Sequence, residues 1–177
     1  CTGWVAECWG CARSVGLPKR RGSGSGVGRA SVNLDEAERV KKIMFHPKMV
    51  PAIVILDPMV TTGLPPMLTA ATGMDALSHS LEAWCSPAYH PMAEGIAAEG
   101  IRLVRNYLPT AVTSGSDVEA RTQMLVASMM GATAFQRGRG ALDALSHPLG
   151  AIYNAHPRPL TGVPPPHDFV STPHVIR

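Results

Sequence analysis

Apolar positions along the chain follow two different patterns, and the change comes near residue 63. Before it, residues 52–57 (Ala-Ile-Val-Ile-Leu-Asp) form a continuous apolar run between Pro51 and Pro58, which predicts a strand. Continuous rather than alternating apolarity is typical of a strand buried on both faces, as in a parallel α/β sheet. Residues 43–45 are a second, shorter candidate strand.

After residue 63 the pattern predicts helices. Pro65 and Pro66 suit a helix start, and residues 67–84 are rich in Ala, Leu and Met. A second helix is expected from Pro91 until Pro109 interrupts it, and a third after a cap at Ser116 or Asp117. We interpret the apolar stripes of these two helices, methionines included, as core: Met92, Ile96, Ile101, Val104 and Leu108, then Leu125, Met129 and Ala132. Residues 141–153 predict a fourth helix, disturbed at Pro148.

The two ends of the chain give weaker patterns. Residues 1–21 are an unassigned leader, and the proline-rich residues 157–177 predict an irregular tail. Between the leader and the first strand, residues 22–28 read Gly-Ser-Gly-Ser-Gly-Val-Gly, which suits either a flexible linker or a tight loop that approaches a phosphate. Val27 breaks the strict dinucleotide-binding fingerprint, so the glycines alone do not decide between them.

Composition excludes several classes of protein. The chain is 45% hydrophobic and 16% charged, which allows a core, and no apolar run approaches the ~20 residues that a membrane-spanning helix needs. The net charge of +3 is modest, and the basic clusters lack the interleaved aromatic residues of a nucleic-acid surface. The Cys-x-x-Cys at Cys8 and Cys11 stands without a second pair, so we interpret these as free thiols. With no signal-peptide pattern, we expect a cytoplasmic protein that binds neither nucleic acid nor membrane.

Two Asp-x-x-x-His pairs are the main candidates for chemistry. Asp75 and His79 are four residues apart, which places a carboxylate and an imidazole on one helical face. Oxygen and nitrogen donors of this kind suit Fe(II) or Zn(II). Asp143 and His147 repeat the spacing, and His156 follows close by. On spacing alone, a shared metal site and two solvated helix pairs are equally well supported.

Longer motifs resemble the iron-containing alcohol dehydrogenase family over residues 22–156. They are Phe45-His-Pro-Lys-Met-Val-Pro51, Ile55-Leu-Asp-Pro58, Gly63-Leu-Pro-Pro-Met-Leu-Thr-Ala-Ala-Thr-Gly-Met-Asp-Ala-Leu-Ser-His79, Tyr89-His-Pro-Met-Ala93, Gly131-Ala-Thr-Ala-Phe135 and Leu145-Ser-His-Pro-Leu-Gly-Ala151. The resemblance implies a mainly α chain with the dehydroquinate synthase-like fold of that family. Residues 63–156 would be its helical metal-binding domain, and residues 22–62 a short α/β remnant of its nucleotide-binding domain.

The resemblance also implies a cofactor and ligands. In the family, a divalent metal held by one Asp and three His lies in a cleft with NAD or NADP. Asp75 matches the carboxylate ligand and His79 the first histidine. The run of Gly22, Ser23, Gly24 and Ser25 matches a Gly-Thr-Gly-Ser segment that lies beside the cofactor.

The chain departs from the family at the remaining ligands. Asp143 stands where the family has its second histidine ligand, and Pro157 stands where it has the third, with His156 next to it. His147 matches a family histidine near the substrate, where it would assist proton movement. Most of the nucleotide-binding domain has no counterpart here, so we expect a truncated member, divergent at both ends.

Three functional hypotheses follow. The first is NAD(P)-dependent interconversion of a small alcohol and its aldehyde, with Fe²⁺ or Zn²⁺ as Lewis acid. The second is a catalytically inactive helical fragment that serves as a structural or interaction domain and associates with further copies of itself through exposed apolar surface. The third is a metal-binding protein without redox activity.

Overall fold

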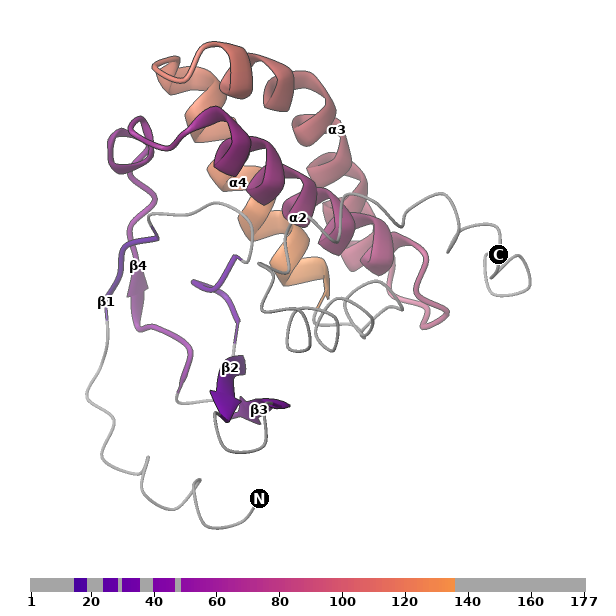
Figure 1. Cartoon of the computed structure of the whole chain (residues 1–177). Helices are drawn as coiled ribbons and strands as arrows, with labels where there is room; N and C mark the ends of the chain where they lie inside the picture. The colour runs from indigo at the N-terminus through magenta and orange to yellow at the C-terminus, as the bar shows by residue number, and fades with distance from the viewer. Residues whose placement is uncertain (1–14, 19–23, 29, 36–39, 47–48, 136–177) are drawn as a thin grey trace.

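The protein folds around three helices, with two small sheets beside them (Figure 1). The computed structural model describes residues 15–18, 24–28, 30–35, 40–46 and 49–135. Its elements, in chain order, are β1 (Val15–Gly16), β2 (Ala30–Asp35), β3 (Val40–Phe45), β4 (Ile53–Val54), η3 (Met59–Thr61), α2 (Pro66–Trp84), α3 (Pro91–Thr113) and α4 (Val118–Phe135). The mainly helical fold class is therefore confirmed. The predicted helix at 141–153 lies outside the described residues, within which no helix is long and apolar enough to cross a membrane.

Each helix begins where local chemistry favours a start. Proline at Pro66 occupies the first turn of α2, where its missing N–H removes no helical hydrogen bond. At the start of α3, His90 Nδ1 accepts from Ala93 N at 3.2 Å. At the start of α4, Asp117 Oδ1 accepts from Ala120 N at 2.9 Å. Of the two caps that the sequence allowed, Ser116 and Asp117, the structure therefore has Asp117.

The predicted end of α3 at Pro109 was wrong, because the helix continues to Thr113. Proline inside a helix forfeits one hydrogen bond and costs about 3 kcal/mol. Here Ala111, in the turn beyond it, is fully buried in the core of the three helices. Packing of that last turn offsets the local penalty, while Pro109 itself stays exposed.

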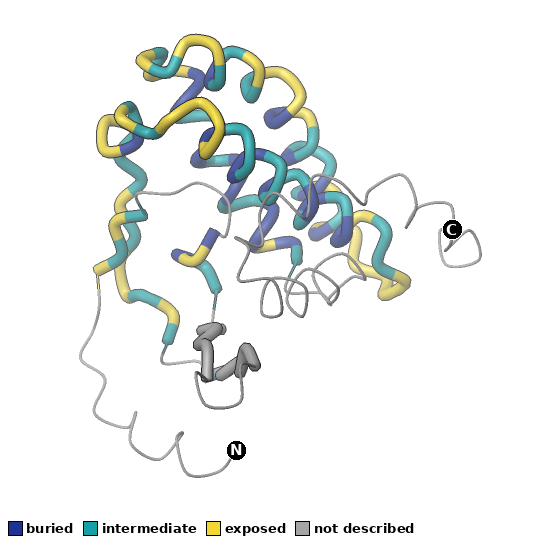
Figure 2. Tube along the Cα trace, viewed as in Figure 1, coloured by how far each residue is buried: buried dark blue, intermediate teal, exposed yellow. Residues whose placement is uncertain are grey.

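The core lies where the three helices face one another, and the buried positions in Figure 2 run along their inner sides. All three pairs of helices are in contact, and short loops make consecutive helices antiparallel. The prediction that Met92 belongs to the core was wrong: it is 76% exposed, while the next residue, Ala93, is the buried position of this first turn of α3. The main core cluster is Ala76, Leu103, Val104, Ala111, Ala120, Met124 and Ala127.

Small residues let the helices approach closely at one crossing. Ser80 on α2 faces Gly100 on α3 and Gly131 on α4. A Cβ at position 100 would lie 2.7 Å from Ser80 Oγ, and one at position 131 would lie 2.9 Å from the same atom. Because tightly packed interiors have no room for added methyl groups, these glycines fix the spacing of all three helices.

Arg121 ties the start of α4 to the segment before α2. Its side chain is fully buried, and Nε donates to Gly115 O at 2.6 Å. The two other guanidinium nitrogens donate to Thr69 Oγ1 at 3.0 Å and to Leu64 O at 3.4 Å. Burial lowers the pKa of this guanidinium. Three acceptors from two separate segments therefore converge on one side chain.

The predicted strand at 52–57 is shorter and more exposed than expected. Only Ile53–Val54 form β4, which pairs parallel with β1 in the register Val15↔Ile53. Parallel pairing agrees with the sequence, but burial on both faces does not: Ile53 is 58% and Ile55 51% exposed. Within the described residues, β1 and β4 form a sheet of two strands, and the face that carries Ile53 and Ile55 is exposed.

The second sheet is an antiparallel hairpin of β2 and β3, with Ala30 opposite Phe45. The expected strand at 43–45 is confirmed and begins earlier, at Val40. Its partner β2 was missed, although residues 30–35 (Ala-Ser-Val-Asn-Leu-Asp) alternate apolar and polar as a strand does.

Replacing Asp117 with alanine is expected to lower the free energy of unfolding by about 1 kcal/mol, because the first turn of α4 loses its side-chain acceptor. Urea unfolding followed by circular dichroism at 222 nm measures the change. Ser116→Ala is the matched control, since the exposed Ser116 precedes the cap. Equal losses in both variants would contradict the assignment of the cap to Asp117.

Candidate metal centre

Asp75 and His79 lie on one face of α2, as their spacing predicts. His79 Nε2 is 4.0 Å from Asp75 Oδ1, and the two side chains are 12% and 13% exposed respectively. That separation is too long for a hydrogen bond. Two polar groups thus face each other at the edge of the core without bonding each other directly.

The imidazole of His79 is held by α4. Its ring lies 4.8 Å from that of Phe135, tilted by 30°, and its Cβ faces Gly131. The other ring nitrogen, Nδ1, is buried and has no hydrogen-bond partner among the residues that the structure describes. The ring orientation is therefore set by packing on one face, while one polar atom still requires a partner.

These two residues fit a divalent metal ion. Ligand bonds from Asp oxygen and His nitrogen are about 2.0–2.2 Å long, so two ligand atoms on one tetrahedral ion lie about 3.4 Å apart. The 4.0 Å between Oδ1 and Nε2 is about half an ångström longer, a difference that a small rotation of either side chain would close. A carboxylate oxygen and an imidazole nitrogen suit Fe²⁺ or Zn²⁺. Asp75 and His79 thus fit as one half of such a site.

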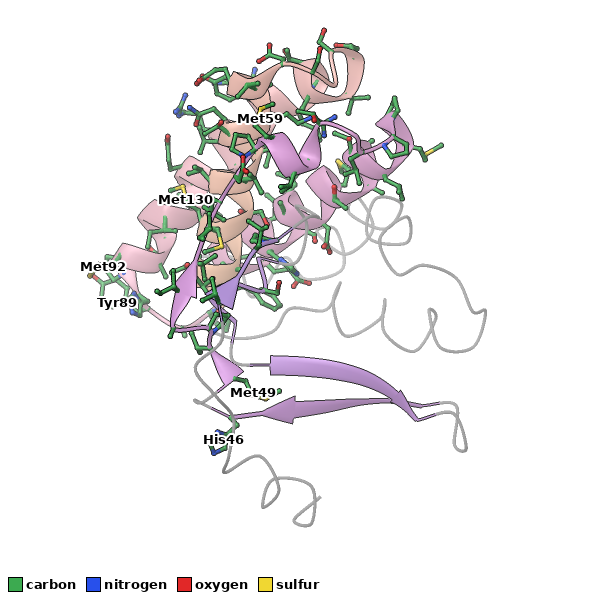
Figure 3. The ribbon with its side chains drawn as sticks, turned by 90° about the vertical axis from the view of Figure 1, so that its left-hand side faces the viewer. His46, Met49, Met59, Tyr89, Met92 and Met130 are labelled. Carbon is green, nitrogen blue, oxygen red and sulfur yellow. The ribbon has the colours of Figure 1, made fainter. Side chains whose placement is uncertain are left out.

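The other predicted ligands lie outside the described part of the chain. Asp143 and His156, together with His147, fall in residues 136–177. Within the described ranges, no group of three or more His, Cys, Asp or Glu side chains is gathered for a metal. Figure 3 shows His46 beside the β2–β3 hairpin, below the helices, so it does not join Asp75 and His79.

The glycine-rich segment forms a tight turn against α4. Gly22 and Ser23 are outside the described residues, but Gly24 is buried with φ +52, and its carbonyl accepts from Val27 N at 3.1 Å. A Cβ at position 24 would lie 2.6 Å from Ser128 O, so only glycine fits. Ser25 is exposed beside it.

The turn and the Asp75–His79 pair pack on the same part of α4. Gly24 faces Ser128 and Ala132, while Gly131, within that segment, faces the Cβ of His79. The glycine turn and His79, about fifty residues apart in the sequence, therefore both contact the stretch of α4 from Ser128 to Ala132, little more than one helical turn.

Sequence reasoning missed Glu82. This glutamate lies three residues after His79 on α2 and is only 8% exposed. The pKa of Cys85, at the end of α2, is raised by burial and by the negative charge of Glu82. The signal was available, since positions 75, 79 and 82 follow helical spacing and share one face.

Comparison with known proteins identifies the family. The sequence profile of the C-terminal part of the Fe-containing alcohol dehydrogenase family matches residues 69–159, about half of the chain. This chain belongs to that family. The matched range contains Asp75 and His79 and also the positions 143, 147 and 156.

Individual relatives match the chain over a longer stretch than the profile does. The chain is 43% identical over 140 residues to 4-hydroxybutyrate dehydrogenase of Cupriavidus necator, covering 78% of this chain and 36% of that protein. It is 36% identical over 154 residues to NAD-dependent methanol dehydrogenase of Bacillus methanolicus, covering 86% and 40%.

A solved structure shows the same arrangement of elements. Sulfoacetaldehyde reductase of Bifidobacterium kashiwanohense, in complex with NAD⁺, superposes with a TM-score of 0.81 at 31% identity, covering 90% of this chain and 45% of that one. The chain spans less than half the length of each of these three proteins.

Proposed function

We propose that this chain is the metal-binding part of an NAD(P)-dependent alcohol dehydrogenase that interconverts a small alcohol and its aldehyde. The observation that carries the proposal is a pair of possible ligand atoms on α2, Asp75 Oδ1 and His79 Nε2, which lie 4.0 Å apart on largely buried side chains. Relatives named as dehydrogenases of 4-hydroxybutyrate and methanol support the substrate class.

The chain's own residues would divide the work as follows. Asp75 and His79 would hold Fe²⁺ or Zn²⁺, and Asp143 and His156 would complete the site. When bound, the ion supplies Lewis-acid stabilisation of the substrate's alkoxide oxygen. Phe135 restricts the ring of His79 to one orientation, and the low exposure of both ligands keeps bulk water from competing for them. His147 would accept the proton of the alcohol.

The glycine turn would serve the nicotinamide cofactor. Gly22, Ser23, Gly24 and Ser25 match the family segment beside NAD or NADP. A backbone without side chains allows a phosphate to come close, and the exposed Ser25 hydroxyl can donate to it. Packing of Gly24 on α4 would hold the cofactor beside the metal centre.

His79→Ala tests the metal site. The intact chain is expected to bind Zn²⁺ in isothermal titration calorimetry. Removing a residue that only supports a metal ligand lowers affinity roughly 10–100-fold, and because His79 is itself a proposed ligand, the variant is expected to lose more than that. His90→Asn is the matched control, because asparagine keeps the cap of α3 while removing an imidazole. Equal affinity of His79→Ala and the unaltered chain would refute the site.

One observation favours a second candidate, an inactive interaction domain. Apolar side chains are exposed along the side formed by β1 and β4, among them Val15, Ile53, Ile55 and Met59. Elemental analysis combined with an NADH fluorescence titration separates the candidates. Metal with NADH binding supports the dehydrogenase, metal alone supports a metal-binding protein without redox activity, and neither supports the interaction domain.

A further inference from the structure

Glu82 occupies a position from which it can act on His79. It follows His79 by three residues on α2, and side chains at that spacing are neighbours on a helix surface. Its exposure is only 8%, so the carboxylate is directed into the protein and away from bulk water. A buried carboxylate requires hydrogen-bond donors.

His79 has a donor to offer. Its Nε2 faces Asp75 Oδ1, and Nδ1 is the buried nitrogen with no hydrogen-bond partner among the described residues. A histidine that binds a metal through one nitrogen ordinarily donates from the other to a carboxylate, a carbonyl or a water. With Nε2 turned to the metal side, that second bond falls to Nδ1.

The two serines beside His79 on α2 do not face its imidazole. Ser78 and Ser80 are each one residue away from His79, and side chains at that spacing point in different directions on a helix. Their hydroxyls donate to Asp75 O at 2.8 Å and to Ala76 O at 3.1 Å. Phe135 covers the imidazole face, where it cannot accept from an in-plane N–H. On this helix, Glu82 is the side chain with acceptor oxygens and the right spacing.

We propose that Glu82 is a positioning residue whose carboxylate accepts the Nδ1–H of His79 through one buried water and keeps Nε2 turned toward Asp75. The part of this proposal in which Nε2 of His79 binds a metal rests on the proposed function. The part in which Glu82 sets the orientation of the His79 ring does not rest on it, because the tautomer of His79 can be measured without metal. The negative charge of Glu82 also acts on Cys85 at the end of α2, where it contributes, after burial, to raising the pKa of the thiol.

The first experiment measures the tautomer. In the full chain, labelled with ¹⁵N-histidine and free of metal at alkaline pH, His79 is expected to carry its proton on Nδ1. Glu82→Gln should retain that tautomer, because the amide oxygen still accepts, whereas Glu82→Leu should lose the preference. An Nε2–H tautomer in the unaltered chain, or an unchanged tautomer in Glu82→Leu, overturns the proposal.

The second experiment measures metal affinity and ligand geometry with cobalt(II). Glu82→Leu is expected to weaken Co²⁺ binding about 10–100-fold and to change its visible absorption spectrum, with Glu82→Gln near the lower end of that range. Glu99→Gln is the control for charge, because Glu99 pairs with Arg102 on the exposed face of α3. Thr72→Val controls for stability, since Thr72 is buried on the same helix and bonds only its own backbone.

The outcomes separate this proposal from the proposed function. If the unaltered chain binds no Co²⁺, the metal site fails, and the tautomer alone decides the role of Glu82. If Thr72→Val changes the Co²⁺ spectrum as much as Glu82→Leu does, Glu82 is merely structural and the proposal is overturned. Should Glu82→Leu not fold, unchanged Co²⁺ affinity in Glu82→Gln has the same consequence.

Discussion

Replacing Gly131 with valine is expected to lower the free energy of unfolding by about 3 kcal/mol and to weaken metal binding at the same time. A Cβ at this position would lie 3.0 Å from the carbonyl oxygen of Ala76, which is backbone and cannot turn aside. It would also lie 3.4 Å from the Cβ of His79. Overpacking of this kind costs about 1–3 kcal/mol, and the branched side chain places this case at the upper end.

Urea unfolding and a Zn²⁺ titration measure the two effects of Gly131→Val. Gly95→Ala is the control, because nothing lies within 4 Å of a Cβ at position 95 of α3. There, alanine should raise the free energy of unfolding by up to about 1 kcal/mol, since glycine is the poorer helix former. If Gly131→Val unfolds at the same urea concentration as the unaltered chain, the close crossing of α2 and α4 is refuted.

Replacing Arg121 with alanine is expected to cost roughly 3–5 kcal/mol of stability. The change leaves a cavity and removes three donated hydrogen bonds, to Gly115 O, Thr69 Oγ1 and Leu64 O. These bonds join the loop before α4 to the segment that leads into α2. We therefore expect the start of α2 to lose its fixed position, with a smaller loss in Arg121→Lys, which keeps the charge but not the planar fork.

Thermal and urea unfolding test the prediction for Arg121, with hydrogen exchange reporting on the first turn of α2. Arg102→Ala is the matched control. Arg102 pairs with Glu99 on the exposed face of α3, where an ion pair is screened by water, so no change in stability is expected. A loss in Arg121→Ala no greater than in Arg102→Ala would show that the buried bonds contribute nothing to the fold.

The sequence alone was sufficient to predict features whose physical cause lies within a few neighbouring residues. Proline at the first turn of α2, and the two candidate caps Ser116 and Asp117 before α4, mark helix starts through their own backbone or side-chain chemistry. The structure has the helices begin there, with Asp117 as the cap. The spacing of Asp75 and His79 placed them on one face, because a helix repeats every 3.6 residues. Motif resemblance gave the family, which the profile match over 69–159 confirms.

Only the tertiary structure decided features that depend on distant segments. Whether α3 survives Pro109 depends on the burial of Ala111 among three helices, which local propensity cannot predict. The apolar run around Ile53 predicts a core residue, yet burial also needs a covering element, and Ile53 is 58% exposed within the described ranges.

The same holds around the metal centre. Asp75 and His79 were chosen from the sequence as a pair, but the pair gains its orientation from Phe135 and Gly131 on α4. Glu82 lay in the helical pattern from the start, and only its burial distinguishes it from a surface glutamate. Spacing along a chain determines which side chains share a face, whereas burial and long-range contact determine which of them can hold a ligand in place.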